Sequence, residues 1–97
     1  MTFQKIDNLM GGSLRRAGAA GKVRAAIVAD TFLAVVRKRY GAAADRAVVR
    51  RFRDGAVTVA CGSSALAEEV RLASAELVAE TNRRLGSETV QRLMAVT

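Results

Sequence analysis

Few side chains in this 97-residue sequence can do catalytic chemistry. The chain contains no His, Pro or Trp, and Cys61 is its single cysteine. Cys61 ends an alternating apolar stretch, which favours a buried, inert thiol over a nucleophile. Glu68 and Glu69 are adjacent and are typical of the acidic residues at the start of a helix. No arrangement of carboxylates indicates an acid–base pair, and no Cys/His set can hold a metal. We therefore expect no enzymatic activity, no catalytic residue, no cofactor and no disulfide within the chain.

Positive charge is the chemical feature that remains. The formal net charge is +7, and residues 1–53 carry twelve Lys and Arg against three acids, whereas residues 54–97 carry four against six. A field of this sign attracts polyanions. Phosphate contacts on the basic half would give binding that is sequence-independent and strongly salt-dependent. The candidate nucleic-acid-binding residues form two groups, one on a predicted helix (Lys22, Arg24, Arg37, Lys38 and Arg39) and one on a predicted hairpin (Arg46, Arg50, Arg51 and Arg53).

A Gly-x-x-Gly sequence at residues 18–21, followed by Lys22, is a second candidate site. It is similar to the loop with which KH domains clamp a nucleic-acid backbone, and in that role Gly18 to Gly21 and Lys22 would contact RNA. The pattern also arises easily in an alanine-rich stretch, so a plain linker between two helices is the favoured interpretation.

Two helices are predicted in the basic half. Residues 3–16 are amphipathic but contain Gly11-Gly12, which indicates a loosely ordered N-terminal helix within residues 1–20. Over residues 22–40, apolar residues such as Val28, Phe32 and Val36 lie on one side of a 3.6-residue period. Gly41 is expected to end this helix.

A β-hairpin is predicted around Asp54-Gly55, a pair typical of a type I′ turn. The expected cross-strand pairs are Arg53 with Ala56, Phe52 with Val57, Arg51 with Thr58, Arg50 with Val59 and Val48 with Cys61. Arg51 and Arg53 then lie on the solvent face. Arg50 falls on the apolar face, where it must extend past the edge of the core unless a bulge shifts the register.

The acidic half predicts one helix and one strand. Ser63 or Ser64 can cap a helix that runs to Gly86, with an apolar stripe that includes Val70 and Leu77. Residues 90–96 read as a strand that Arg92 interrupts, and Leu72 points away from the stripe as an exposed residue. The expected order is helix, helix, strand, strand, helix, strand. This order predicts one α+β domain over residues 1–97, with helices on one face of a three-stranded sheet.

The segment from Gly55 onward resembles the DciA family of bacterial replicative-helicase loaders. The resemblance is closest over residues 55–93 and consists of an alternating strand, a Ser-Ser helix start, a helix running into Asn-x-x-Leu-Gly and a short final strand. The positions that carry it are Gly55, Val57, Val59, Ser63, Ser64, Leu66, Leu77, Asn82, Leu85, Gly86, Val90 and Leu93. It implies a KH-like domain that binds single-stranded or forked DNA and contacts the replicative helicase during loading.

Three kinds of partner follow from this reading. DNA bound by the basic half is the leading one, RNA bound at Gly18–Gly21 is the alternative, and an acidic protein partner is a third class. No apolar run approaches the roughly 20 residues of a membrane span, and the N-terminus lacks the apolar region of a signal peptide. A cytoplasmic protein with no membrane partner is therefore expected.

Overall fold

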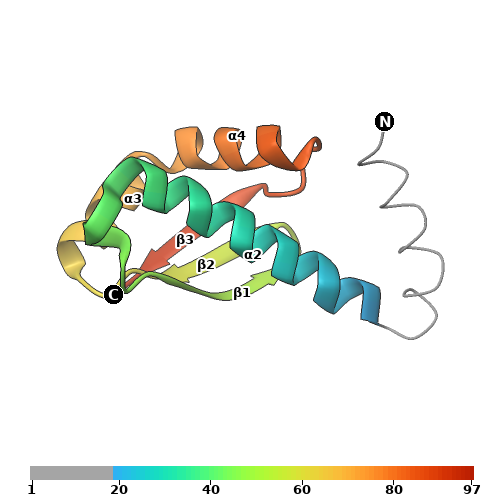
Figure 1. The fold of residues 1–97 in the computed structure, drawn as a ribbon, viewed down its shortest axis with the longest axis horizontal. Helices are drawn as coiled ribbons and strands as arrows, with labels where there is room; N and C mark the ends of the chain where they lie inside the picture. The colour runs from blue at the N-terminus through green and yellow to red at the C-terminus, as the bar shows by residue number, and fades with distance from the viewer. Residues whose placement is uncertain (1–18) are drawn as a thin grey trace.

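The computed structural model of the chain describes residues 19–97. The helix predicted over residues 3–16 and Gly18 lie outside these residues. The described elements, in chain order, are helix α2 (Ala19–Tyr40), the 3₁₀ helix η1 (Gly41–Ala44), strands β1 (Val48–Arg53) and β2 (Ala56–Ala60), helices α3 (Ser64–Leu72) and α4 (Ser74–Leu85), and strand β3 (Arg92–Val96) (Figure 1).

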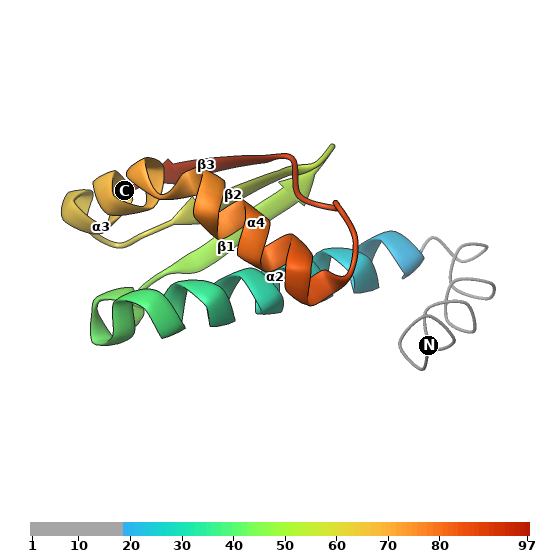
Figure 2. The ribbon, with the colours of Figure 1, turned by 90° about the horizontal axis from the view of Figure 1, so that it is seen from above.

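The three strands form one mixed sheet. β2 is central, antiparallel to β1 and parallel to β3. Figure 2 shows α2 and α4 on the same side of this sheet. The predicted α+β class and the placement of the helices on one face are therefore confirmed.

The core lies between the helices and the inner face of the sheet. Val28, Phe32 and Val36 of α2 are at most 1% exposed, and Val57 and Val59 of β2 are fully buried. These residues are the ones that the two periodicities select, because a 3.6-residue period in α2 and a two-residue period in β2 each bury one face. Val70 of α3 and Leu77 of α4 complete the packing, as the apolar stripe predicts.

The predicted ends of the helices are confirmed. Gly41 follows α2 with φ +60, and Gly86 follows α4 with φ +79, a left-handed conformation that glycine adopts without strain. Ser63 is the N-cap of α3, and its Oγ accepts a hydrogen bond from the Leu66 amide at 3.1 Å.

The single helix predicted between Ser63 and Gly86 is wrong, because the chain forms two. α3 ends at Leu72, and Ala73 leaves helical geometry at φ −98 and ψ 13. Alanine is a good helix former, so nothing in the local sequence signals this break. Tertiary packing accounts for it: the break lets α3 pack against β3 while α4 packs against both α2 and β3.

The interpretation of residues 18–21 as a loop is also wrong for the residues that can be checked. Ala19, Ala20 and Gly21 are the first residues of α2. Alanine has the highest helix propensity, which outweighs the cost of about 1 kcal/mol for one glycine. The described chain therefore presents no open Gly-x-x-Gly loop.

Candidate nucleic-acid interface

The turn of the β1–β2 hairpin has the predicted geometry. Asp54 and Gly55 have φ values of +54 and +79, as a type I′ turn requires. Three predicted pairs are confirmed, namely Arg53 with Ala56, Phe52 with Val57 and Arg51 with Thr58. Because Val57 is buried on the inner face, the alternation places Arg51 and Arg53 on the outer, solvent-facing side of the sheet.

Beyond Arg51 the structure follows the alternative that the sequence left open, a bulge that shifts the register. A bulge lies between Val49 and Arg51, so that Val49 pairs with Val59 and Val48 with Ala60. The predicted pairs of Arg50 with Val59 and of Val48 with Cys61 are therefore wrong. The extra residue is Arg50, which the bulge leaves unpaired and exposed instead of on the apolar face. The apolar position opposite Val59 goes to Val49, which packs against the core.

The sheet adds an arginine that sequence reasoning missed. β3 pairs with β2 in parallel, and its Arg92 lies beside Ala56, which in turn pairs with Arg53. Arg53 and Arg92 are therefore in one cross-strand row, separated by two strand spacings, or about 10 Å. The residue looked like an interruption of the strand. Leu93 and Ala95 face inward, so the two-residue alternation of β3 places Arg92 on the outer face. The sequence could have predicted this only if the pairing of β3 with β2 had been known.

Two sets of hydrogen bonds hold Arg92 in this row. The carbonyl of Gly55 accepts bonds from the amides of Gln91 at 2.7 Å and Arg92 at 3.0 Å, which tie the hairpin turn to the start of β3. The Asn82 side chain bonds to both backbone groups of Val90, each at 2.8 Å. Asn82 lies in the last turn of α4, which continues to Leu85, and its side chain fixes the chain that enters β3.

The second basic group is not beside the hairpin turn. Arg37, Lys38 and Arg39 lie in the last turn of α2, near the start of β1, whereas the hairpin turn is at the opposite end of that strand (Figure 1). Six residues of β1 span about 17 Å between them. Arg24 is exposed near the other end of α2, and the side chain of Lys22 lies outside the description. The nine predicted residues therefore form no single cluster.

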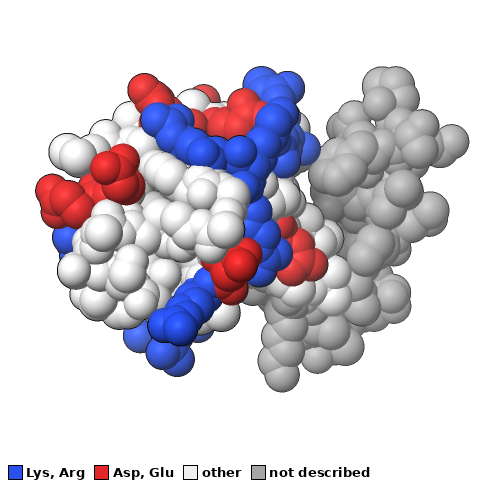
Figure 3. All heavy atoms as spheres, turned by 60° about the vertical axis from the view of Figure 1, so that its left-hand side comes forward, with Lys and Arg blue, Asp and Glu red and all other residues white. Residues whose placement is uncertain are grey.

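Ion pairs divide the arginines into two classes. Arg39 contacts Glu76 at 2.7 Å, and this hydrogen-bonded contact raises the pKa of Arg39. Glu80 binds both Arg83 and Arg84, and their hydrogen bonds lower its pKa to about 2. Figure 3 shows one face of the molecule, on which Lys and Arg side chains form a band that runs down from α4 and acidic side chains lie beside them.

The hairpin belongs to the other class. Its three arginines, Arg50, Arg51 and Arg53, are exposed and form no ion pair with any residue that the structure describes. Arg92 is likewise exposed without such a partner in residues 19–97. Their positive charge is thus available to a polyanion, whereas the charge of Arg83 and Arg84 is partly neutralised.

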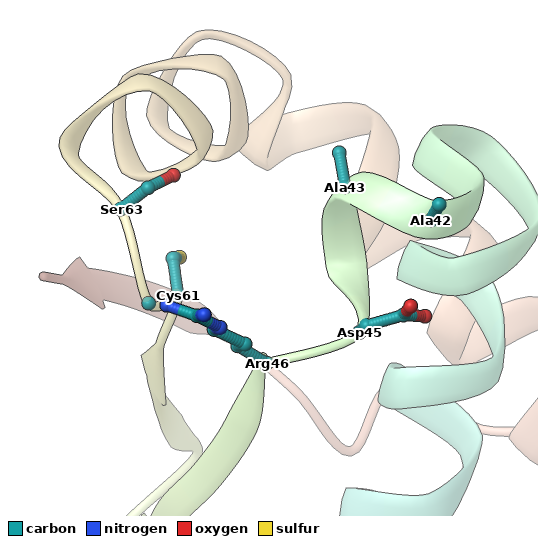
Figure 4. A pocket seen from close by; sticks show the side chains of 7 residues that line it. Ala42, Ala43, Asp45, Arg46, Cys61 and Ser63 are labelled. Atoms are coloured by element: carbon teal, nitrogen blue, oxygen red, sulfur yellow. The ribbon is translucent and has the colours of Figure 1, made fainter.

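A small pocket lies between η1 and the start of α3. It has a volume of about 330 Å³, and Asp45, Arg46 and Cys61 are among the residues that line it. The side chains of Asp45 and Arg46 point in different directions (Figure 4), so they form no paired site. Cys61 is 1% exposed, and burial raises the pKa of its thiol, as expected of an inert residue. Within residues 19–97, no cluster of His, Cys, Asp or Glu could hold a metal ion.

These features define a small α+β domain whose outer sheet face carries unpaired arginines. The family model for Dna[CI] antecedent, DciA, matches residues 5–94. The chain therefore belongs to the DciA family, and the resemblance read from residues 55–93 is confirmed over nearly the whole chain. This membership supports a general role as a loader of the DnaB-type replicative helicase, in a family of adaptors and not of known enzymes. No curated protein matches the sequence. Among the described helices, none is both long enough and apolar enough to traverse a bilayer.

Proposed function

We propose that this protein is a non-enzymatic adaptor that binds DNA through the hairpin arginines and so assists loading of the replicative helicase. The observation that carries the proposal is the set of exposed side chains Arg50, Arg51, Arg53 and Arg92, none of which pairs with an acid in the described chain. An unpaired guanidinium donates bidentate hydrogen bonds to phosphate, and it does so without first breaking a bond inside the protein.

Backbone contact is the form of binding that these residues favour. Base stacking needs exposed aromatic side chains. In the described residues the aromatics are otherwise engaged: Phe32 is fully buried, Phe52 packs against the core, and the Tyr40 hydroxyl donates to the Glu69 carbonyl at 3.3 Å. Binding should therefore be independent of sequence and steeply dependent on salt.

The two remaining basic sites have secondary roles in this proposal. Arg37 and Lys38 add to the positive field at the end of α2, toward the opposite end of β1 from the hairpin turn, and can contact phosphates farther along a bound strand. Arg39 and Arg46 contribute less, because Arg39 is held by Glu76 and the aliphatic stem of Arg46 packs beside Gly62.

The test is a fluorescence-anisotropy titration with single-stranded DNA, forked DNA and RNA of equal length, each over a series of salt concentrations. The chain should bind DNA with a log–log salt slope of several ions, and the double variant Arg51→Glu/Arg53→Glu should lower a single-strand slope by about 1.4. Arg83→Glu/Arg84→Glu is the matched control, because it changes charge by the same amount at residues already paired with Glu80.

Equal losses from the two double variants would refute the hairpin as the contact. Weak binding of the parent protein to all three nucleic acids at about 150 mM salt, where exposed charges are well screened, would refute DNA binding itself. Tighter binding to RNA than to either DNA would replace DNA with RNA as the ligand.

A further inference from the structure

The outer face of the sheet has a regular composition. Three cross-strand rows cover it, and each has one residue from β1, one from β2 and one from β3: Val48, Ala60 and Val96; Arg51, Thr58 and Met94; Arg53, Ala56 and Arg92. Neither α2 nor α4 covers this face, because both lie on the other side of the sheet (Figure 2).

One end of this face is apolar. Val48 is 47% exposed, Met94 55% and Val96 42%, although all three are in a folded sheet. β2, the strand between them, has only the small side chains of Ala60 and Thr58 beside these residues, which leaves the larger aliphatic groups of the edge strands accessible. Met94 and Val96 are neighbours on the same face of β3, and Val48 lies across β2 from Val96. Exposed aliphatic residues that share one face of a sheet are a candidate interaction surface.

The opposite end is basic, and the face has no acid. Arg51, Arg53 and Arg92 contribute three positive charges, and none of the nine residues is Asp or Glu. A face-to-face contact between two copies would bring like charges together, which disfavours a second copy as the occupant. The face also has no aromatic residue, and without one the exposed aliphatic end gives nucleic-acid bases no stacking platform. Arg and Met are, in contrast, residues enriched in protein interfaces.

We propose that the outer sheet face docks an amphipathic segment of a protein partner. The apolar side chains of that segment would contact Val48, Met94 and Val96, and its carboxylates would contact Arg51, Arg53 and Arg92. This inference rests on the proposed function in one respect: the replicative helicase is taken as the protein that supplies the segment. The apolar end then serves the protein contact alone, while the arginines at the hairpin can be shared with DNA.

The experiment measures the affinity of the full chain for the purified replicative helicase by biolayer interferometry, with DNA affinity measured in parallel. Met94→Asp and Val96→Asp should each weaken helicase binding at least tenfold and leave DNA binding within twofold. Leu72→Asp is the matched control, because Leu72 is 76% exposed but lies at the end of α3, outside the sheet. It should change neither affinity. Circular dichroism and sedimentation of each variant establish that it is folded and unchanged in oligomeric state.

Each other outcome has a distinct meaning. Unchanged helicase binding in both folded sheet variants would overturn the docking surface and leave DNA binding intact. Loss of DNA binding by Met94→Asp, or its conversion of a dimer into a monomer, would overturn the protein partner in favour of DNA or of a second copy. Failure of the parent protein to bind the helicase would refute the helicase as partner, and with it the source of the segment. If Met94→Asp does not fold, Val96→Asp and Met94→Gln provide the same comparison.

Discussion

Replacement of Asn82 by alanine should destabilise the domain more than its partly buried position suggests. The Asn82 carboxamide donates to the Val90 carbonyl and accepts from the Val90 amide, both at 2.8 Å. Val90 is 2% exposed, so water cannot readily replace these bonds. Asn82→Ala leaves two Val90 backbone groups without their partner, and an unsatisfied buried group costs about 1–3 kcal/mol. Because the two bonds are partly buried, the lower part of the summed range applies, and the better helix propensity of alanine offsets a little over 0.5 kcal/mol of it. We therefore expect the free energy of unfolding to fall by about 2–4 kcal/mol.

Urea unfolding followed by circular dichroism measures this loss, provided that the denaturant slope is unchanged. In thermal unfolding the midpoint should fall by roughly 10–25 °C for a domain of this size. Glu88→Ala is the control, because Glu88 is exposed in the same connection and forms none of its hydrogen bonds; its effect should stay within about 0.5 kcal/mol. If Asn82→Ala lowers the free energy of unfolding by less than about 0.5 kcal/mol, the two Asn82–Val90 hydrogen bonds do not hold β3 in place.

Three further predictions concern stability and ionisation. Gly62→Ala should lower the free energy of unfolding by about 1–3 kcal/mol in urea, because Gly62 has φ +87 and a new Cβ would lie 2.7 Å from the Cβ of Arg46. The carboxylate of Glu80 should titrate near pH 2 by NMR, so its ion pairs stabilise the fold fully above pH 4.5 and are lost as the pH falls through about 2. Arg83→Ala should raise the pH at which Glu80 titrates, and an unchanged value would contradict the pairing. Cys61 should react with a thiol reagent only after unfolding, and rapid reaction of the native protein would show that the thiol is accessible.

The charge on β1 could also serve to keep this edge strand from pairing with other chains, without any contact to DNA. An exposed edge strand can pair with other chains, and natural proteins prevent this with charged residues and bulges. β1 is an edge strand with a bulge at Arg50 and arginines beside it. Reversal to glutamate separates the two explanations, because a glutamate keeps the edge charged while it removes affinity for phosphate. Lost DNA binding with unchanged solubility in Arg51→Glu/Arg53→Glu would support the ligand contact.

The sequence predicted the buried face of α2 and the turn of the β1–β2 hairpin, because both depend on residues close together in the chain. The apolar stripe through Val28, Phe32 and Val36 identifies the buried face of α2, and Asp54-Gly55 identifies the turn and the register of the pairs next to it. These signals work because helix and strand periodicity and a type I′ turn are set by neighbouring residues.

The missed features depend on tertiary contacts. The awkward position of Arg50 indicated that a bulge could occur, but not where: the bulge lies at Arg50 because Val49 fills the apolar position opposite Val59. The break at Ala73 depends on how α3 and α4 pack on separate partners. Arg92 joined the candidate site only once β3 was known to run parallel to β2, since that pairing sets which residues share its row.

Helicase loading is the reaction in which DNA contact through the hairpin arginines should matter. Purified replicative helicase, forked DNA and the full chain are combined, and unwinding is followed by the release of a labelled strand. The parent protein should accelerate unwinding, Arg51→Glu/Arg53→Glu should lose most of this stimulation, and Arg83→Glu/Arg84→Glu should retain it. No stimulation by the parent protein, or equal stimulation by the two variants, would refute loading through DNA contact at the hairpin.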